Sequence, residues 1–377
     1  MYIILFIVIF ACLLFNSEKK QLSNVKYKLL LFFLWLFLAF RYGQGTDYFS
    51  YYYIHSNNAT LHEALFNTHA THSEIGFRLL CWLFKYDYTY LVFFVSTIEM
   101  IMLHRFIKKY STSHIMSLLL VYPTIYLTYF FSAMREGIVI ALFIGIMIEC
   151  LEKGNKRAYY IFSLLCCSIH IVSILFFIVP FVIKIDYRKL IRIAWIALAF
   201  GGVSWIAQLY NYIQFIPIIG KQIVSYSPQI GMVALLERIL TLVLALYLLQ
   251  GIDIEANNNS SILYLFKIYS FGFICYAALL FLPLVSSRSA ILFKVVEIVL
   301  FPLLYSKTHT KLKDKQLIIG IVVVVATVMT IKNINSYISQ GKYHSNINIV
   351  NYPYVSVFDK DEIWNYRDGN IYYDLVD

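Results

Sequence analysis

The stretch that decides the fold is "KLLLFFLWLFLAF", residues 28–40, followed directly by "RYGQGTDYFSYYY", residues 41–53. The first part is a continuous apolar run, which predicts the end of a membrane-spanning helix. The second part places an arginine, two glycines, an aspartate and several tyrosines where the chain leaves the hydrocarbon. Charged and aromatic residues at the mouth of a spanning helix indicate a candidate functional site.

The composition predicts an all-α, polytopic integral membrane protein. Of 377 residues, 60% are hydrophobic and 14% charged, whereas about a quarter of the residues are charged in soluble domains. The apolar residues form repeated long runs, so we expect about 10–12 transmembrane or re-entrant helices in one integral domain, 1–377. The expected spans lie near 1–15, 25–40, 88–104, 114–131, 137–151, 190–209, 232–250, 262–282, 289–305 and 317–331.

The basic residues follow the pattern of an inserted protein. The net charge is +10, and 18 of the 31 Lys and Arg residues lie in five short connections. These connections are 16–28, 105–112, 152–157, 184–192 and 306–316. Basic loops between apolar runs predict cytoplasmic loops and argue against a nucleic-acid-binding surface. The six cysteines lie in apolar segments without C-x-x-C spacing, so we expect no disulfide or zinc framework.

The stretch 158–183 has two interpretations, a single tilted helix or a re-entrant hairpin that turns at His170. The hairpin leaves all five basic connections on one side of the membrane, so the charge distribution favours it. Both termini are then outside, together with loop 41–87, loop 210–231 and the tail 332–377. The candidate site residues described next all fall at this outer face.

Three arginines mark the outer ends of expected helices: Arg41, Arg135 in "SAMREG" and Arg288 in "VSSRSA". Charge at membrane depth is costly, and such residues usually face an interior or a wet cavity. The guanidinium fork also matches phosphate oxygens, so three arginines at one face predict a site for an anionic headgroup or a pyrophosphate. The alternative is that each arginine pairs with lipid headgroups at the interface.

Two residues at the same face are candidates for proton transfer. His170 lies in apolar surroundings, and histidine titrates near neutral pH, although a lone histidine there is often a hydrogen-bonded core residue. Asp47 is a candidate base or sugar acceptor, and the alternative is a helix cap.

Ionisable residues within expected spans are interpreted as internal pairs. Lys294 and Glu297 are three residues apart in "ILFKVVEIVL", which favours an ion pair over a transport relay, and Glu237–Arg238 is interpreted similarly.

The chain resembles the EpsG family of polysaccharide-biosynthesis membrane proteins, relatives of the Wzy-type polymerases. The matching stretches, in the family's order, are "FRYGQGTDYFSYYY" (40–53), "SEIGFRLL" (73–80), "SAMREGIVIALF" (132–143), "SIHIVSILFF" (168–177), "SSRSAILF" (286–293) and "NYPYVSVF" (351–358). Each is short, so their succession carries the resemblance. One departure is Glu136, where the family more often has Gln, and this carboxylate would mute the charge of Arg135.

The resemblance implies a GT-C-like glycosyltransferase of the cytoplasmic membrane with its active site outside. It would join polyprenyl-pyrophosphate-linked oligosaccharide units, as donor and acceptor, into a capsular polysaccharide, exopolysaccharide or O-antigen. Further candidate partners are the lipid bilayer, a chain-length regulator and a flippase. No cofactor, metal or nucleic acid is expected.

In the expected mechanism, a hydroxyl of one unit attacks the anomeric carbon of another, which inverts as lipid pyrophosphate leaves. Arg135 and Arg288, with Arg41 third, would stabilise the charge on the leaving group. His170 is the first candidate for the base and Asp47 the second.

Sugar contacts are expected from Tyr48, Tyr52 and Glu74. Two other functions stay open. A flippase of lipid-linked oligosaccharide would need charges distributed through its spans, and an acyltransferase acting on surface sugar would use His170 as its base.

Overall fold

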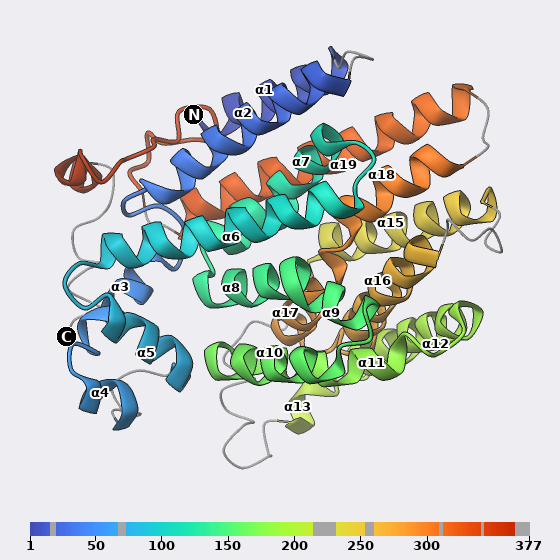
Figure 1. Ribbon diagram of the computed structural model, residues 1–377, viewed down its shortest axis with the longest axis horizontal. Helices are drawn as coiled ribbons and strands as arrows, with labels where there is room; N and C mark the ends of the chain where they lie inside the picture. Colours follow the sequence, from blue (N-terminus) through green and yellow to red (C-terminus); the bar gives the residue numbers. More distant parts are fainter. Residues whose placement is uncertain are drawn as a thin grey trace. The chain divides into compact units, whose positions relative to one another are not determined.

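The computed structural model describes residues 1–15, 20–66, 73–213, 231–252, 260–308, 312–340 and 343–365. Within these ranges the chain is helical and contains no strand, so the predicted all-α fold is confirmed (Figure 1). By length and hydropathy, six helices in this part of the chain could cross a membrane, or seven if a bent pair counts as one span. The protein is therefore a multi-pass membrane protein.

The candidate spans agree broadly with the expected ones. They are Leu22–Ala39, Tyr88–Tyr110, Tyr187–Ile206, Met232–Gln250, Ser260–Ala278 and Gln316–Ser339, with the bent pair Pro283–Lys294 and Glu297–Lys307. Three shorter apolar helices are Tyr2–Leu14, His114–Phe130 and Ile171–Val182. The expected spans 114–131 and 137–151 each contain a π-helical stretch, η1 (Tyr122–Phe130) or η2 (Phe143–Met147), so neither is one regular α-helix.

The chain divides into two compact units. Unit 1 comprises residues 1–171 and 316–377, and unit 2 comprises residues 172–315. The single domain expected from the sequence stays a prediction.

The helices of unit 1, besides η1 and η2, are α1 (Tyr2–Leu14), α2 (Lys20–Ala39), α3 (Tyr48–Ser56), α4 (Leu61–Phe66), α5 (Ile75–Leu83), α6 (Tyr88–Tyr110), α7 (His114–Val121), α8 (Met134–Leu142), α9 (Ile148–Glu152), α10 (Lys156–Ile169), most of α19 (Leu312–Gln340), and η5 (Lys360–Asn365). The helices of unit 2 are most of η3 (Ile171–Ile178), α11 (Val179–Val182), α12 (Tyr187–Ile206), α13 (Tyr210–Ile213), α15 (Met232–Gln250), α16 (Ser260–Ala278), α17 (Pro283–Lys294) and α18 (Glu297–Lys307).

Helix α6 is the central element of unit 1 and packs against α2, α8 and η2 (Figure 1). At its C-terminal end, Arg105 and Lys109 form ion pairs of 2.7 and 2.8 Å with Glu149 and Glu152 of α9. The basic connections 105–112 and 152–157 therefore lie at one end of this unit. The short helices α3, α4 and α5 lie at the other end, beside the N-termini of α6 and α8 (Figure 1). This separation agrees with the predicted cytoplasmic and outer ends.

The segment after α2 is fixed by contacts with distant parts of unit 1. The amide of Tyr42 donates to the carbonyl of Val355 at 3.0 Å, and the amide of Val357 donates to the carbonyl of Phe40 at 2.9 Å. Gly45 has a φ of +94°, and a Cβ there would lie 2.5 Å from the carbonyl oxygen of Phe131. A side chain at position 45 would therefore be strained by both backbone conformation and space.

In unit 2, α16 packs against α12 and α17. Helices α17 and α18 are bent by 49° at a break between them. The Lys294 ammonium at this break lies 2.5 Å from the carboxylate of Glu297 and 2.9 Å from that of Glu237. The predicted Lys294–Glu297 ion pair is therefore confirmed, and Glu237 is a second partner. Arg238 stacks instead over the ring of Tyr276, 4.0 Å from its centre.

Three segments whose ends were predicted from the sequence compare differently with the structure. The stretch 158–183 is interrupted at His170, where α10 has ended and the backbone is extended (φ −152°, ψ 115°), while the relative direction of its two arms stays a prediction. Helix α19 continues to Gln340 instead of ending at 331. Most of the expected outer loop 210–231 lies outside the described residues.

Candidate functional site

Four charged side chains of unit 1 contact one another and form what we term the charged cluster: Glu74, Arg135, Glu136 and His170. They come from three separate elements. Glu74 is the N-cap residue of α5, Arg135 and Glu136 lie in the first turn of α8, and His170 is the C-cap residue of α10. The cluster therefore joins three helix ends at the end of unit 1 opposite to its basic connections.

Glu74 is the central acceptor of the cluster. Its side chain does not cap its own helix. Instead, Oε2 accepts from Arg135 Nη1 at 2.5 Å, while Oε1 accepts from the amide of Ile171 at 3.0 Å and lies 3.3 Å from His170 Nδ1. One carboxylate thus holds the start of α8 and the end of α10 together.

A glycine allows this arrangement. A Cβ on Gly76 would lie 2.6 Å from the carbonyl oxygen of Ser168 and 2.7 Å from its carbonyl carbon. Because these are backbone atoms, they cannot move aside cheaply. Glycine at position 76 therefore lets the first turn of α5 approach the end of α10 closely enough for Glu74 to reach Ile171.

His170 lies between two carboxylates. Its Nε2 is 3.1 Å from Glu136 Oε1, and its Nδ1 faces Glu74. Burial lowers the pKa of His170, but hydrogen bonds to Glu136 and Glu74 outweigh burial and raise it above the ordinary 6.5. The arrangement therefore favours the imidazolium, which donates from both nitrogens, and this state is not a proton acceptor. This argues against His170 as the first candidate for the base.

The charges of the cluster balance when His170 is protonated. Burial opposes the ionisation of Glu74, but the hydrogen bond to His170, the charge of Arg135 and the amide of Ile171 lower the pKa of Glu74 to about 2. Two cations then face two carboxylates. If His170 were neutral, the cluster would carry one net negative charge and would repel an anionic substrate.

Helix α3 connects the charged cluster with Asp47. The guanidinium carbon of Arg135 lies 5.7 Å from the centre of the Tyr51 ring. Burial raises the pKa of Tyr51 to about 12. The positive charge of Arg135 lowers this pKa, and the negative charge of Asp47 raises it further. Asp47 is half-buried at the N-cap of α3 but its side chain makes no capping hydrogen bond. The charges of Arg135 and Asp47 therefore act on the Tyr51 hydroxyl in opposite directions.

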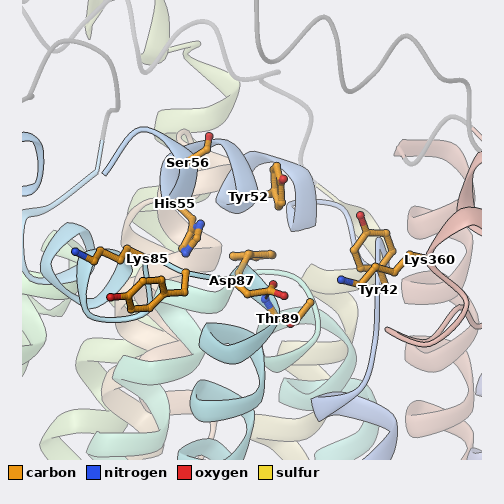
Figure 2. Close-up of a pocket in the computed structure, with 10 residues that line it drawn as sticks. Tyr42, Tyr52, His55, Ser56, Lys85, Asp87, Thr89 and Lys360 are labelled. Atoms are coloured by element: carbon orange, nitrogen blue, oxygen red, sulfur yellow. Dashed lines mark hydrogen bonds between the residues drawn. The ribbon is translucent and has the colours of Figure 1, made fainter. Parts of the chain in front are cut away.

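A pocket of about 380 Å³, which we term the Tyr52 pocket, also borders α3. It is lined by Tyr42, Tyr52, His55, Ser56, Lys85, Tyr86, Asp87, Tyr88, Thr89 and Lys360. Figure 2 shows Lys85 and Lys360 at opposite ends of this pocket, with Tyr52, His55 and Asp87 between them. Since consecutive helical residues are about 100° apart around the axis, Tyr51 and Tyr52 can serve the charged cluster and the pocket respectively.

Two predicted site residues lie in the packed interior instead. The Arg41 guanidinium is 2% exposed and donates to the carbonyls of Leu38 and Phe130 and to the hydroxyl of Ser96, at 2.6, 3.1 and 3.2 Å. It thereby ties together α2, η1 and α6, which explains an arginine at the mouth of α2. Tyr48 is also buried and packs edge-on against Tyr88. We therefore assign structural roles to Arg41 and Tyr48.

The other predicted residues are distributed over both units. Arg135, His170 and Glu74 lie in the charged cluster, and Tyr52 lines the pocket. Arg288 is half-buried on α17 of unit 2, so its predicted convergence with Arg135 stays a prediction.

Two lysines that line the pocket and one side-chain contact of the charged cluster were not predicted from the sequence. Lys85 and Lys360 were not singled out, because each stands alone in a short polar connection. Glu136 was expected to mute the charge of the adjacent Arg135, and its contact with His170, 3.1 Å between Oε1 and Nε2, was not foreseen. Its position one residue after Arg135 was the available signal, since neighbouring helical side chains point in different directions.

These observations define a class, a multi-pass membrane protein with a charged and aromatic site at one end of a helical unit. A comparison with protein families matches residues 24–354 to the EpsG family. The chain belongs to this family of polysaccharide-biosynthesis membrane proteins. No curated protein and no solved structure shows a significant match, so the expected GT-C-like fold stays a prediction.

Proposed function

We propose that this protein is a glycosyltransferase that joins polyprenyl-pyrophosphate-linked oligosaccharide units into a surface polysaccharide at the outer face of the cytoplasmic membrane. The observation that carries the proposal is the charged cluster, in which Glu74, itself bound to His170, holds Arg135 beside a tyrosine-rich helix. Family membership supports polysaccharide biosynthesis. The separation of this cluster from the basic connections supports its outer location.

Arg135 is the proposed pyrophosphate-binding residue. Charge grows on the leaving pyrophosphate during the transfer, and a preorganised cation stabilises that charge without further reorganisation. Glu74 fixes the guanidinium, and both side chains of this pair are about one-fifth exposed (19% and 20%). His170 as a cation offsets the second carboxylate, Glu136, so that the cluster does not repel the anion. Arg288 is the proposed second arginine.

Asp47 replaces His170 as the proposed base. The attacking hydroxyl must lose a proton, and two carboxylates beside His170 favour its protonated form, which cannot accept that proton. Asp47 lies on the same helix end as Tyr51 and is half-buried. In the proposed step, the acceptor oxygen bonds to the anomeric carbon, its proton passes to Asp47, and the bond to the lipid pyrophosphate breaks with inversion. No metal takes part in this proposal.

The test uses cells that lack this protein and are complemented with variants. We expect Arg135→Gln to abolish the polymer ladder while single lipid-linked units accumulate where a membrane-impermeant oxidant reaches them. The matched control is Arg105→Gln, which removes an arginine from the basic end of the same unit and should leave the polymer intact. Full-length polymer from Arg135→Gln, at a normal level of inserted protein, would show that the assignment is wrong.

A flippase is the second candidate, because of one observation in unit 2. Lys294, Glu237 and Glu297 are buried among helices long enough to span the membrane, and transporters carry such charges. The same cells distinguish the two functions. Lipid-linked units that are protected from the oxidant, on the cytoplasmic face, would favour the flippase.

A further inference from the structure

We propose that the Tyr52 pocket binds an acidic saccharide, with Lys85 and Lys360 pairing with its anionic groups and tyrosines packing against its rings. This inference rests on the proposed function and specifies its substrate class. The pocket contains the features that saccharide binding requires, namely aromatic walls, hydrogen-bonding groups and a volume of about 380 Å³, within the common range of ligand sites.

The aromatic part of the pocket is held in place by packing within unit 1. The ring of Tyr52 meets that of Tyr88 edge-on with centres 5.5 Å apart, and His55 contacts the same ring at 5.5 Å. His55 Nε2 is 2.9 Å from the carbonyl oxygen of Phe84, which orients the imidazole. Such a wall offers apolar ring surface and polar edges together, as sugar rings require.

Both lysines are positioned along tyrosine rings. Lys85 Nζ lies 5.5 Å from the centre of the Tyr86 ring, and Lys360 Nζ lies 5.6 Å from that of Tyr42. Cation–π contacts of this kind are weak at exposed sites, so the ammonium groups can still pair with a ligand. Asp87 caps α6 through Oδ1, which accepts from the amide of Thr89 at 2.8 Å. Two lysines against this one carboxylate leave the lining net positive.

The arrangement of the charges favours an acidic sugar over a pyrophosphate. Figure 2 places the two lysines at opposite ends of the pocket, with tyrosine and histidine between them. A single pyrophosphate is compact and would need cations that converge on it. Separated cations fit carboxylates on an extended saccharide. Because α3 borders both sites, the pocket would place the saccharide beside Arg135, where we propose that its lipid pyrophosphate lies.

The test is equilibrium binding by the full chain in nanodiscs at low salt. The probes are trigalacturonate and its carboxyl-reduced neutral form, which have the same rings and linkages. We expect the acidic probe to bind about tenfold more tightly, which corresponds to about 1.4 kcal/mol. The double variant K85Q/K360Q should remove this preference. K85R/K360R, which retains both charges, should keep most of it.

The matched control is K153Q/K156Q, which makes the same change in net charge at the opposite, basic end of unit 1. It should bind both probes like the unaltered protein. Equal affinity for the two probes, no binding of either, or complete displacement of trigalacturonate by an equal concentration of inorganic pyrophosphate would each overturn the inference. Since neither probe carries a lipid pyrophosphate, such a failure leaves the proposed polymerisation to be judged by the fate of the lipid-linked units.

Discussion

Glu74→Gln is the substitution that most directly perturbs the charged cluster. Glutamine keeps the size of the side chain but removes the charge that faces Arg135 and His170. Lowering the Glu74 pKa from 4.5 to about 2 corresponds to about 3 kcal/mol at 1.36 kcal/mol per pH unit. Solvent reaches part of this carboxylate and screens the interaction, so we expect a loss of about 1–3 kcal/mol in the free energy of unfolding.

The pH dependence gives this prediction a specific sign. Glu74 has a lowered pKa in the folded protein, so its contribution is fully present above its ordinary pKa of 4.5 and is lost as the pH falls through about 2. The difference in the free energy of unfolding between the unaltered protein and Glu74→Gln should therefore close below about pH 5, as Glu74 gains a proton, and shrink again as the pH rises above the ordinary 6.5 and His170 loses its proton. The variant should also lower the pKa of His170, because one of its two carboxylates is gone.

The assay is thermal unfolding of the purified full chain in detergent micelles over a range of pH, with His170 titrated by NMR. Glu362→Gln, which removes an exposed carboxylate of unit 1, is the control and should unfold like the unaltered protein. The reasoning is refuted if Glu74→Gln matches the unaltered protein at pH 7. It is also refuted if the stability difference widens as the pH falls below about 5.

Two further substitutions test the packing and the buried charges. Gly76→Ala should destabilise unit 1 by about 1–3 kcal/mol and reduce polymer yield, since its Cβ would meet the backbone of Ser168. Gly320→Ala, where a Cβ meets nothing within 4 Å, is the control, and equal unfolding temperatures would contradict the prediction. Lys294→Met should cost about 3–5 kcal/mol by leaving two buried carboxylates without their shared cation. The triple variant K294M/E237Q/E297Q should recover most of that loss in thermal unfolding, and no recovery would show that the charges are not the cause.

Local sequence patterns were sufficient to predict the helices and the contacts between residues a few positions apart in the chain. Long apolar runs predicted the all-helical membrane fold, and the three-residue spacing of Lys294 and Glu297 predicted their ion pair. The interruption at His170 was one of two interpretations of its segment. Each of these depends on helix geometry or hydropathy, which a single sequence displays directly.

Contacts between distant segments could not be predicted in the same way. Glu74 is 61 residues from Arg135 and 96 from His170, and no local rule gives their pairing. Arg41 had the sequence features of a substrate-binding arginine, but its guanidinium is buried and donates to two distant groups, the hydroxyl of Ser96 and the carbonyl of Phe130. The Tyr52 pocket likewise depends on Lys360 from the C-terminal segment meeting residues 42–89.

The most direct test of the central claim is to supply the purified protein, in liposomes, with lipid-linked repeat units and no other enzyme. The account predicts a ladder of longer glycans together with release of polyprenyl pyrophosphate, and loss of both with Arg135→Gln. Repeat units that stay single, while the unaltered protein is folded and correctly inserted, would contradict it.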